Sequence, residues 1–153
     1  MKPYVNIYYW PNGNKQFEVY MIDNKYHRED GPAKIYYHEN GNIRCKIYYI
    51  DDHITKRFFY YENGNIRCKV YYIDDHITKR FFYYENGQLE QEDYWINNPD
   101  YPDHEIGILH REDGPARIQY HENGIIKKEE YSFEGEILSI FQWMIMVSTK
   151  KGE

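Results

Sequence analysis

Two identical acidic segments carry the side chains best suited to binding a metal ion. The sequence Asp-Asp-His occurs at residues 51–53 and again at residues 74–76. Carboxylate oxygens and imidazole nitrogens both bind divalent cations. Equivalent residues of adjacent hairpins should lie roughly 10 Å apart, however, too far to share an ion whose bonds are about 2–2.6 Å long. We therefore predict solvated acidic turns, with no metal site and no cofactor.

A second candidate for chemistry is the motif HREDGPA, which occurs at residues 27–33 and 110–116. A histidine beside carboxylates suits acid–base chemistry, but the sequence places no activated nucleophile or closed pocket next to it. We predict that these side chains pair with one another in polar turns, and we predict no catalytic site. The residues selected are His27, Arg28, Asp30, Gly31 and Pro32, with their equivalents His110, Arg111, Asp113, Gly114 and Pro115.

The two cysteines, Cys45 and Cys68, occupy equivalent positions of successive repeats. The expected separation of roughly 10 Å exceeds the roughly 7 Å between Cα atoms that a disulfide tolerates. We expect free thiols in mid-strand on the apolar face, where burial raises the thiol pKa and lowers reactivity. Free thiols and the lack of a visible signal peptide favour an intracellular, non-secreted protein.

The elements that position these residues are repeated β-hairpins. Residues 40–62 and 63–85 form two units of 23 residues that differ only by Val70 in place of Ile47. Asn-Gly between runs of Ile, Tyr and Phe predicts two-residue type I′ turns. For the apolar residues to keep to one face, each Asp-Asp-His segment should form a three-residue turn.

With these turns, one face of the sheet is apolar and the other places cations beside aromatic rings. The expected cross-strand pairs are Tyr60 with Arg67, Phe58 with Lys69, and Lys56 with Tyr71. Three interpretations are open: rings and cations that only stabilise a thin sheet, a protein-binding surface, or a stacking platform for single-stranded nucleic acid. The candidate interaction face consists of Phe58, Tyr60, Arg67, Lys69, Tyr71, Phe81 and Tyr83.

The composition fits a thin sheet. The 153 residues include 19 tyrosines, and a mean hydropathy of -0.94 accompanies 19% aromatic residues. Disordered chains are poor in aromatics, whereas a sheet clothed in Tyr, Lys and Arg stems reconciles both values. The net charge of -6 gives no reason to expect nucleic acid as a partner.

The remaining chain extends the repeat pattern. Long-turn units at 18–41 and 92–124 flank the tandem units, and the second carries an insertion that we expect to be a surface loop, from Pro99 to Gly107. We predict a repeat domain over residues 1–135. Residues 136–153 form a separate C-terminal segment and tail.

The C-terminal sequence EILSIFQWMIMV, at residues 136–147, is far shorter than the roughly 20 apolar residues of a membrane span. Its pattern fits either a strand or a short helix. It could cap the terminal sheet edge, associate with a second copy, or contact a membrane. The residues selected for self-association are Ile140, Phe141, Trp143 and Met144.

HREDGPA, the recurring YYENGN and the 23-residue period together resemble the MORN-variant repeats, also called YwqK-like antitoxin repeats. The resemblance covers about residues 10–133 and implies an elongated antiparallel meander. The HREDGPA-containing type is seen in giant DNA viruses and some bacteria, so a viral protein, and then a virus particle as its location, is one expectation. The classical MORN glycine pattern is absent, so lipid binding does not transfer.

We therefore predict an all-β, elongated, single-layer meander of about ten or eleven antiparallel strands with a capping C-terminal segment. The expected function is a non-catalytic protein-interaction or assembly module, with protein partners and a homo-oligomer through the C-terminal segment. The alternative is an antitoxin or immunity protein that neutralises a toxin. We do not expect nucleic acid or membrane partners.

Overall fold

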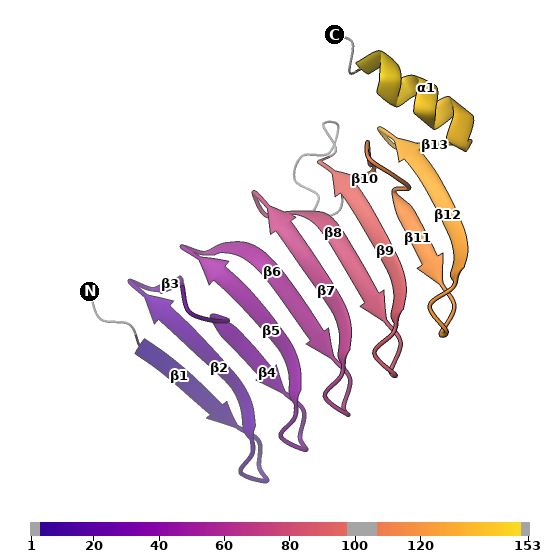
Figure 1. Ribbon diagram of the computed structural model, residues 1–153. Coiled ribbons are helices and arrows are strands. Elements are labelled where there is room, and N and C mark those ends of the chain that lie inside the picture. Colours follow the sequence, from indigo (N-terminus) through magenta and orange to yellow (C-terminus); the bar gives the residue numbers. More distant parts are fainter. Residues whose placement is uncertain (1–3, 98–106, 151–153) are drawn as a thin grey trace.

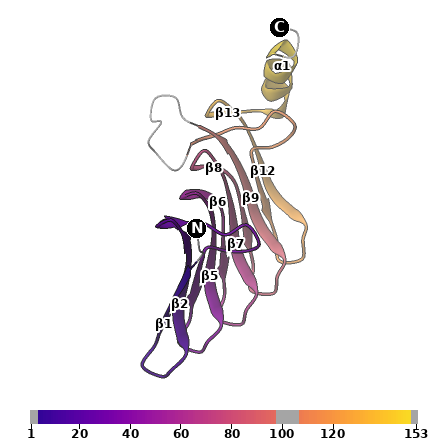
Figure 2. The same cartoon turned by 90° about the vertical axis from the view of Figure 1, so that its left-hand side faces the viewer.

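The computed structural model describes residues 4–97 and 107–150. Thirteen strands form one open antiparallel sheet, and a single helix follows at its C-terminal end (Figure 1). Eleven strands lie on the main path, and the two-residue strands β3 and β10 pair beside it. The predicted all-β meander is confirmed. Figure 2 shows the sheet edge-on as one curved layer.

The elements have the following bounds. They are β1 (Tyr4–Tyr9), β2 (Lys15–Ile22), β3 (Lys25–Tyr26), β4 (Lys34–Tyr37), β5 (Ile43–Ile50), β6 (His53–Tyr60), β7 (Ile66–Ile73), β8 (His76–Tyr83), β9 (Leu89–Ile96), β10 (Ile108–Leu109), β11 (Arg117–Tyr120), β12 (Ile126–Phe133), β13 (Glu136–Leu138) and α1 (Ile140–Lys150). Most of the insertion predicted as a surface loop lies outside the described residues.

The Asn-Gly turns are longer than the sequence predicted. In the turn between β6 and β7, Tyr61 N–H donates to Asn65 O at 2.8 Å, and Gly64 N–H donates to Tyr61 O at 3.0 Å. Gly64 has a φ of +90°, but Asn63 does not adopt the left-handed region. The loop is therefore a three-residue turn ending in a left-handed glycine, and the expected type I′ turn is wrong. The Asn63 side chain instead accepts a hydrogen bond from Asn65 N–H at 2.9 Å.

The acidic turns are shorter than predicted. Ile50 pairs with His53, so the loop between β5 and β6 contains two residues, Asp51 and Asp52. Their φ values of 50° and 70° are the pair of positive values that a type I′ turn requires. The expected three-residue turn is wrong. Aspartate tolerates this region because its short polar side chain can bond the local backbone.

Regular bulges restore the register that the sequence predicted. Phe58 pairs with Lys69 and Lys56 pairs with Tyr71, as expected. Each hairpin shifts register once near its turn, so the misassigned loop lengths cancel along the strands. One pair nearer the turn changes: Tyr60 pairs with Ile66, so the predicted Tyr60–Arg67 pair is wrong.

The two faces of the sheet differ in chemistry. We call one the thiol face; it carries Cys45, Ile47, Arg57, Phe59, Cys68, Val70, Arg80 and Phe82 on β5 to β8. We call the other the ladder face; it carries Lys46, Tyr48, Lys56, Phe58, Tyr60, Lys69, Tyr71, Lys79, Phe81, Tyr83 and Tyr94. The buried hydrophobic cluster consists of Cys68, Val70, Tyr72, Ile77 and Trp95.

The C-terminal segment is a short strand followed by a helix. β13 pairs with β12. Ser139 caps the N-terminus of α1 with a capping box: Ser139 N–H donates to Gln142 Oε1 at 3.0 Å, and Gln142 N–H donates to Ser139 Oγ at 3.3 Å. Trp143 Nε1 donates to Arg111 O at 2.8 Å, and Val147 is buried. Among the described residues, no helix is long and apolar enough to cross a membrane.

Candidate functional site

The most extensive candidate site is a ladder of aromatic rings on the ladder face. Each ring lies on a different strand from β5 to β9. Successive ring centroids are 5.5, 6.0, 5.9 and 6.1 Å apart, and three of the four contacts are edge-on. The rings in order are Tyr48, Phe58, Tyr71, Phe81 and Tyr94. Centroid spacings of 4.5–7 Å are those of favourable aromatic pairs, so the ladder is a continuous apolar strip.

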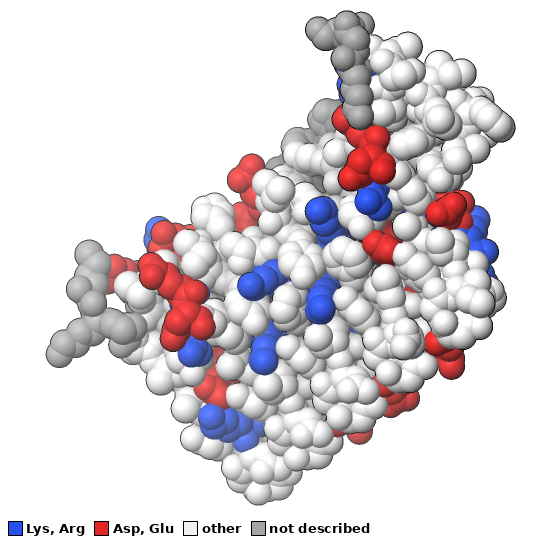
Figure 3. All heavy atoms as spheres, in the orientation of Figure 1, with Lys and Arg blue, Asp and Glu red and all other residues white. Residues whose placement is uncertain are grey.

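Four lysines lie against rings of this face. Lys56 Nζ is 4.3 Å from the centroid of Tyr48, and Lys79 Nζ is 5.7 Å from that of Tyr94. Lys46 lies 5.4 Å from the Tyr60 ring, and Lys69 lies 5.1 Å from the Tyr83 ring. In Figure 3, basic groups gather over the middle strands of this face and acidic groups lie mainly around its periphery. A net negative chain therefore presents a locally positive, aromatic surface.

Two carboxylates bound to tyrosines flank this surface, one of them buried and the other half-buried. Glu18 is 4% exposed and accepts hydrogen bonds from Lys15 Nζ, Tyr20 OH and Tyr37 OH. Burial alone would raise the pKa of Glu18, but the hydrogen bonds from Lys15, Tyr37 and Tyr20 hold that pKa below its usual value. This arrangement fixes the ring orientations at the N-terminal end of the face.

The same arrangement recurs toward the C-terminal end. Glu92 accepts hydrogen bonds from Tyr94 OH at 2.7 Å and from Tyr120 OH. Burial and the bond to Glu92 raise the pKa of Tyr94 to about 12, so the phenol remains a donor at neutral pH. Sequence analysis missed these clusters, although the Glu-X-Tyr spacing at 18–20 and 92–94 places both side chains on one face.

The structure brings together six of the seven residues predicted for the interaction face. Phe58, Tyr60, Lys69, Tyr71, Phe81 and Tyr83 lie on the ladder face. Arg67 does not, because the bulge beside Ile66 turns it toward Phe59, whose centroid lies 5.8 Å from its guanidinium carbon. Tyr48 and Tyr94, which the prediction omitted, complete the ring ladder.

Both cysteines are free and buried on the thiol face. Burial raises the pKa of Cys45 to about 11, although the charges of Arg57, Arg44 and Arg67 act in the opposite direction. Burial likewise raises the pKa of Cys68 to about 11. Because only a thiolate is an effective nucleophile, neither side chain is activated at neutral pH.

The HREDGPA motif forms the return from β3 to β4 and from β10 to β11. Arg28 lies over the Tyr20 ring, 4.0 Å from its centroid, and its Nε is 2.8 Å from Asp30 Oδ1. Gly31 leaves room for this arginine, since a Cβ there would lie 3.0 Å from Arg28 Nε. Ala33, directly before β4, is fully buried.

The histidines of the motif bind the next hairpin turn. His110 Nδ1 accepts a hydrogen bond from Glu134 N–H at 3.0 Å, and its Nε2 lies 3.5 Å from Glu112. In the first unit, His27 Nδ1 lies within hydrogen-bond distance of both Asp51 N (3.2 Å) and Asp51 Oδ1 (2.9 Å). Both rings therefore connect the long turn to a neighbouring hairpin.

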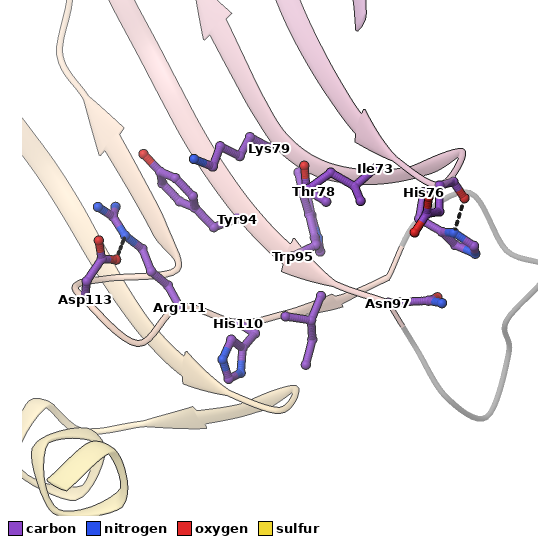
Figure 4. Close-up of a pocket in the computed structure, with 12 residues that line it drawn as sticks. Ile73, His76, Thr78, Lys79, Tyr94, Trp95, Asn97, His110, Arg111 and Asp113 are labelled. Carbon is purple, nitrogen blue, oxygen red and sulfur yellow. Dashed lines mark hydrogen bonds and ion pairs between the residues drawn. The ribbon is translucent and has the colours of Figure 1, made fainter. Parts of the chain in front are cut away.

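An open hollow of about 560 Å³ adjoins the second motif, between β8, β9 and the β10–β11 turn (Figure 4). Lys79, Tyr94 and Arg111 point toward one another at one side of it. Arg111 Nε is paired with Asp113 at 2.5 Å, and Thr78 Oγ1 donates to Tyr71 O at 3.3 Å. These polar groups already have structural partners, and the arrangement contains no nucleophile bonded to a general base.

The acidic turns connect adjacent hairpins. Asp75 accepts hydrogen bonds from Ile54 N–H at 2.8 Å and from His53 Nδ1 at 2.8 Å. His53, directly after one acidic turn, therefore reaches a carboxylate of the next turn, and this hydrogen bond joins adjacent hairpins. Within the described part of the chain, no group of three or more His, Cys, Asp or Glu residues could hold a metal ion.

Of the residues selected in the C-terminal segment, three are accessible and one is a packing residue. Phe141 and Met144 are 75% and 55% exposed, and Ile140 is 44% exposed. Trp143 instead faces the sheet, 5.2 Å from the Tyr131 ring.

The hairpins from β4 to β9 are similar to a known repeat. Three segments match the MORN repeat variant. They are residues 30–51, 56–74 and 79–97, which cover most of β4 to β9 and therefore the ring ladder. MORN repeats are typically protein-interaction or structural modules and are generally non-enzymatic. The YwqK-like type and the viral origin stay predictions.

No curated protein matches the chain. A solved structure titled Glycosylation Associate Protein (Gap123) complex, from Streptococcus agalactiae, is similar over 59% of this chain with 18% identity and a TM-score of 0.39. The chain spans only 16% of that protein's length.

Proposed function

We propose that the protein is a non-catalytic interaction module whose protein partner binds across the ladder face. The observation that carries the proposal is the unbroken run of five rings from Tyr48 to Tyr94, flanked by four lysines, on one side of a single-layer sheet. Interface cores are enriched in aromatic residues, and rings need little ordering on binding because they have few rotatable bonds. The match to MORN repeats supports this class of function.

The proposal is tested by capturing partners from the native lysate with matched variants. Tyr71→Ala and Phe81→Ala remove two central rings of the ladder face. Lys127→Ala and Glu129→Ala change exposed residues of β12, outside the ring ladder. We expect the ring variant to lose specific partners that the β12 variant and the wild type retain, with folding checked by circular dichroism. Equal recovery with all three proteins would contradict the proposal.

We propose in addition that α1 joins two copies of the chain. Support comes from four exposed apolar side chains, one in β13 and three in α1: Ile137, Phe141, Met144 and Ile145, which are 69%, 75%, 55% and 63% exposed. Unpartnered apolar patches of this kind are common at oligomer interfaces. Light scattering after size exclusion should report a dimer for the wild type and a monomer for Phe141→Ser with Ile145→Ser. The control, Ile125→Ser with Ile126→Ser, removes similarly exposed isoleucines elsewhere and should stay dimeric.

A further inference from the structure

The thiol face, opposite the ladder face, carries a row of arginines across the tandem repeats. Each lies beside an aromatic ring of the same face, with its guanidinium carbon 4.8–5.9 Å from a ring centroid. The row consists of Arg44, Arg57, Arg67 and Arg80. Arg44 and Arg67 occupy equivalent positions of the two units, as do Arg57 and Arg80. The arginines of the row therefore repeat with the 23-residue period of the tandem units.

Two adjoining open hollows lie between these arginines. One, of about 400 Å³, is lined by Arg44 and Cys45 among others, and the second, of about 510 Å³, by Cys68 and Arg80. Arg57, Phe59 and Arg67 line both hollows, so the two adjoin, and we treat them as one groove. The groove crosses the strands from β4 to β8, with apolar side chains and thiols at its floor.

Farther along the same face, the chain itself places a carboxylate between two arginines. Asp93 on β9 lies opposite Arg80 on one neighbouring strand and Arg117 on the other. Val70 on β7 occupies the equivalent place, between Arg57 and Arg80. Asp93 is fully buried and accepts a hydrogen bond from Arg117 Nε at 2.6 Å, and its Oδ2 lies 3.5 Å from Arg80. A carboxylate thus fits between guanidiniums of this face.

The tandem repeats have aliphatic residues, Ile47 and Val70, where β9 has that aspartate. Arg44 and Arg67 are exposed and form no ion pair with the described residues. Guanidiniums bind carboxylates through paired, charge-assisted hydrogen bonds. Glu90 also lines the second hollow, but among the described residues it forms no ion pair with Arg44 or Arg67. These two arginines can therefore bind carboxylates supplied from outside the described chain.

The repeat period sets the spacing of those carboxylates. Equivalent arginines are two strands apart, which is about 9.6 Å across a sheet. A polyproline II helix rises about 3.1 Å per residue with three residues per turn, so every third side chain lies on one side, about 9.3 Å from the last. In a β-strand, by contrast, every third side chain points to the opposite side.

We propose that this groove binds an acidic peptide segment in the polyproline II conformation, with a carboxylate at every third residue. Its carboxylates bind Arg44 and Arg67, with Arg57 and Arg80 beside them, and its pyrrolidine rings pack on Phe59 and Phe82. This site is separate from the ladder face, so either proposal can fail without the other.

The test uses the full chain and fluorescein-labelled peptides of identical composition. One peptide is (Glu-Pro-Pro)₄, and the other has four consecutive glutamates between two four-proline blocks. Fluorescence anisotropy at 150 mM salt should show at least tenfold tighter binding of the spaced peptide. Arg44→Gln with Arg67→Gln should weaken that binding at least tenfold. Lys46→Gln with Lys69→Gln makes the same charge change on the same strands but on the ladder face, and should change the affinity less than threefold.

Four results would overturn the proposal. They are no binding of the spaced peptide at 1 mM protein, equal affinity for the two peptides, equal weakening by the arginine and lysine variants, and tighter binding of a single-stranded oligonucleotide of equal charge. Circular dichroism and thermal melting of each variant separate lost binding from lost folding. As an independent readout, bound spaced peptide should slow alkylation of Cys45 and Cys68 at the groove floor, and unchanged rates would contradict its placement there.

Discussion

Replacing Asp93 by asparagine should destabilise the sheet because it removes the negative charge of a fully buried carboxylate that is bound by two arginines. The carboxylate accepts hydrogen bonds from Arg117 at 2.6 Å and from Gln91 at 2.9 Å, and its Oδ2 lies 3.5 Å from Arg80. Hydrogen bonds to charged groups contribute about 1.5–3 kcal/mol each. The arginines are 31% and 27% exposed, so water recovers part of the loss. We expect a decrease of about 3 kcal/mol in the free energy of unfolding.

Urea denaturation followed by tyrosine and tryptophan fluorescence measures this change, and calorimetry should show a melting temperature lower by roughly 6–12 °C. The control is Glu90→Gln, which makes the same charge change at an exposed position of the same strand. It should remain within about 0.5 kcal/mol of the wild type. If Asp93→Asn cost less than about 1 kcal/mol, the carboxylate would not be the tightly bound group that we describe.

The pKa of His53 is raised, first by its hydrogen bond to Asp75 and then by that residue's charge, while the same bond lowers the pKa of Asp75. The histidine's contribution to stability is therefore complete below its unfolded pKa of about 6.5 and is lost as the pH rises through its pKa in the folded protein. In acid the contribution of the pair is also lost, because Asp75 becomes protonated. His53→Gln should lower stability at pH 5.5 and not at pH 9, and NMR should give a midpoint above that of a model histidine. Burial raises the pKa of Cys45 and of Cys68 to about 11, so the alkylation rate of both thiols in the folded protein should still increase between pH 9 and pH 10. Mass spectrometry can follow these rates, and a plateau by pH 9 would contradict the burial of the thiols. Trp143→Ala removes the ring and hydrogen bond that hold α1 to the sheet, so proteolysis should release the helix faster; unchanged cleavage would refute this anchoring role.

The repeat period and side-chain alternation were enough to predict the sheet and most of its register. The turns were misassigned because Asn-Gly fits two kinds of loop, and local sequence does not reveal the bulge that distinguishes them. The error had a local effect only, since each bulge compensates for its turn. It did move Arg67 to the thiol face, because one extra residue reverses the direction of a side chain.

Features that depend on contacts between repeats were harder to predict. The His53–Asp75 pair joins residues 22 positions apart, and no spacing rule brings them together. The carboxylate–tyrosine clusters could have been found from the Glu-X-Tyr spacing, and α1 from Ser139 followed three residues later by Gln142, which is a capping-box signal. Only the strand pairing shows which rings adjoin.

Photocrosslinking from the ladder face tests the proposed interaction most directly. A benzoylphenylalanine at Tyr71, in the middle of the ring ladder, is compared in the native cell with one at Lys127, an exposed residue of β12. We predict a discrete adduct with a second protein from position 71 and none from position 127. Absence of an adduct at 71, or the same adducts from both positions, would contradict a partner bound across the rings.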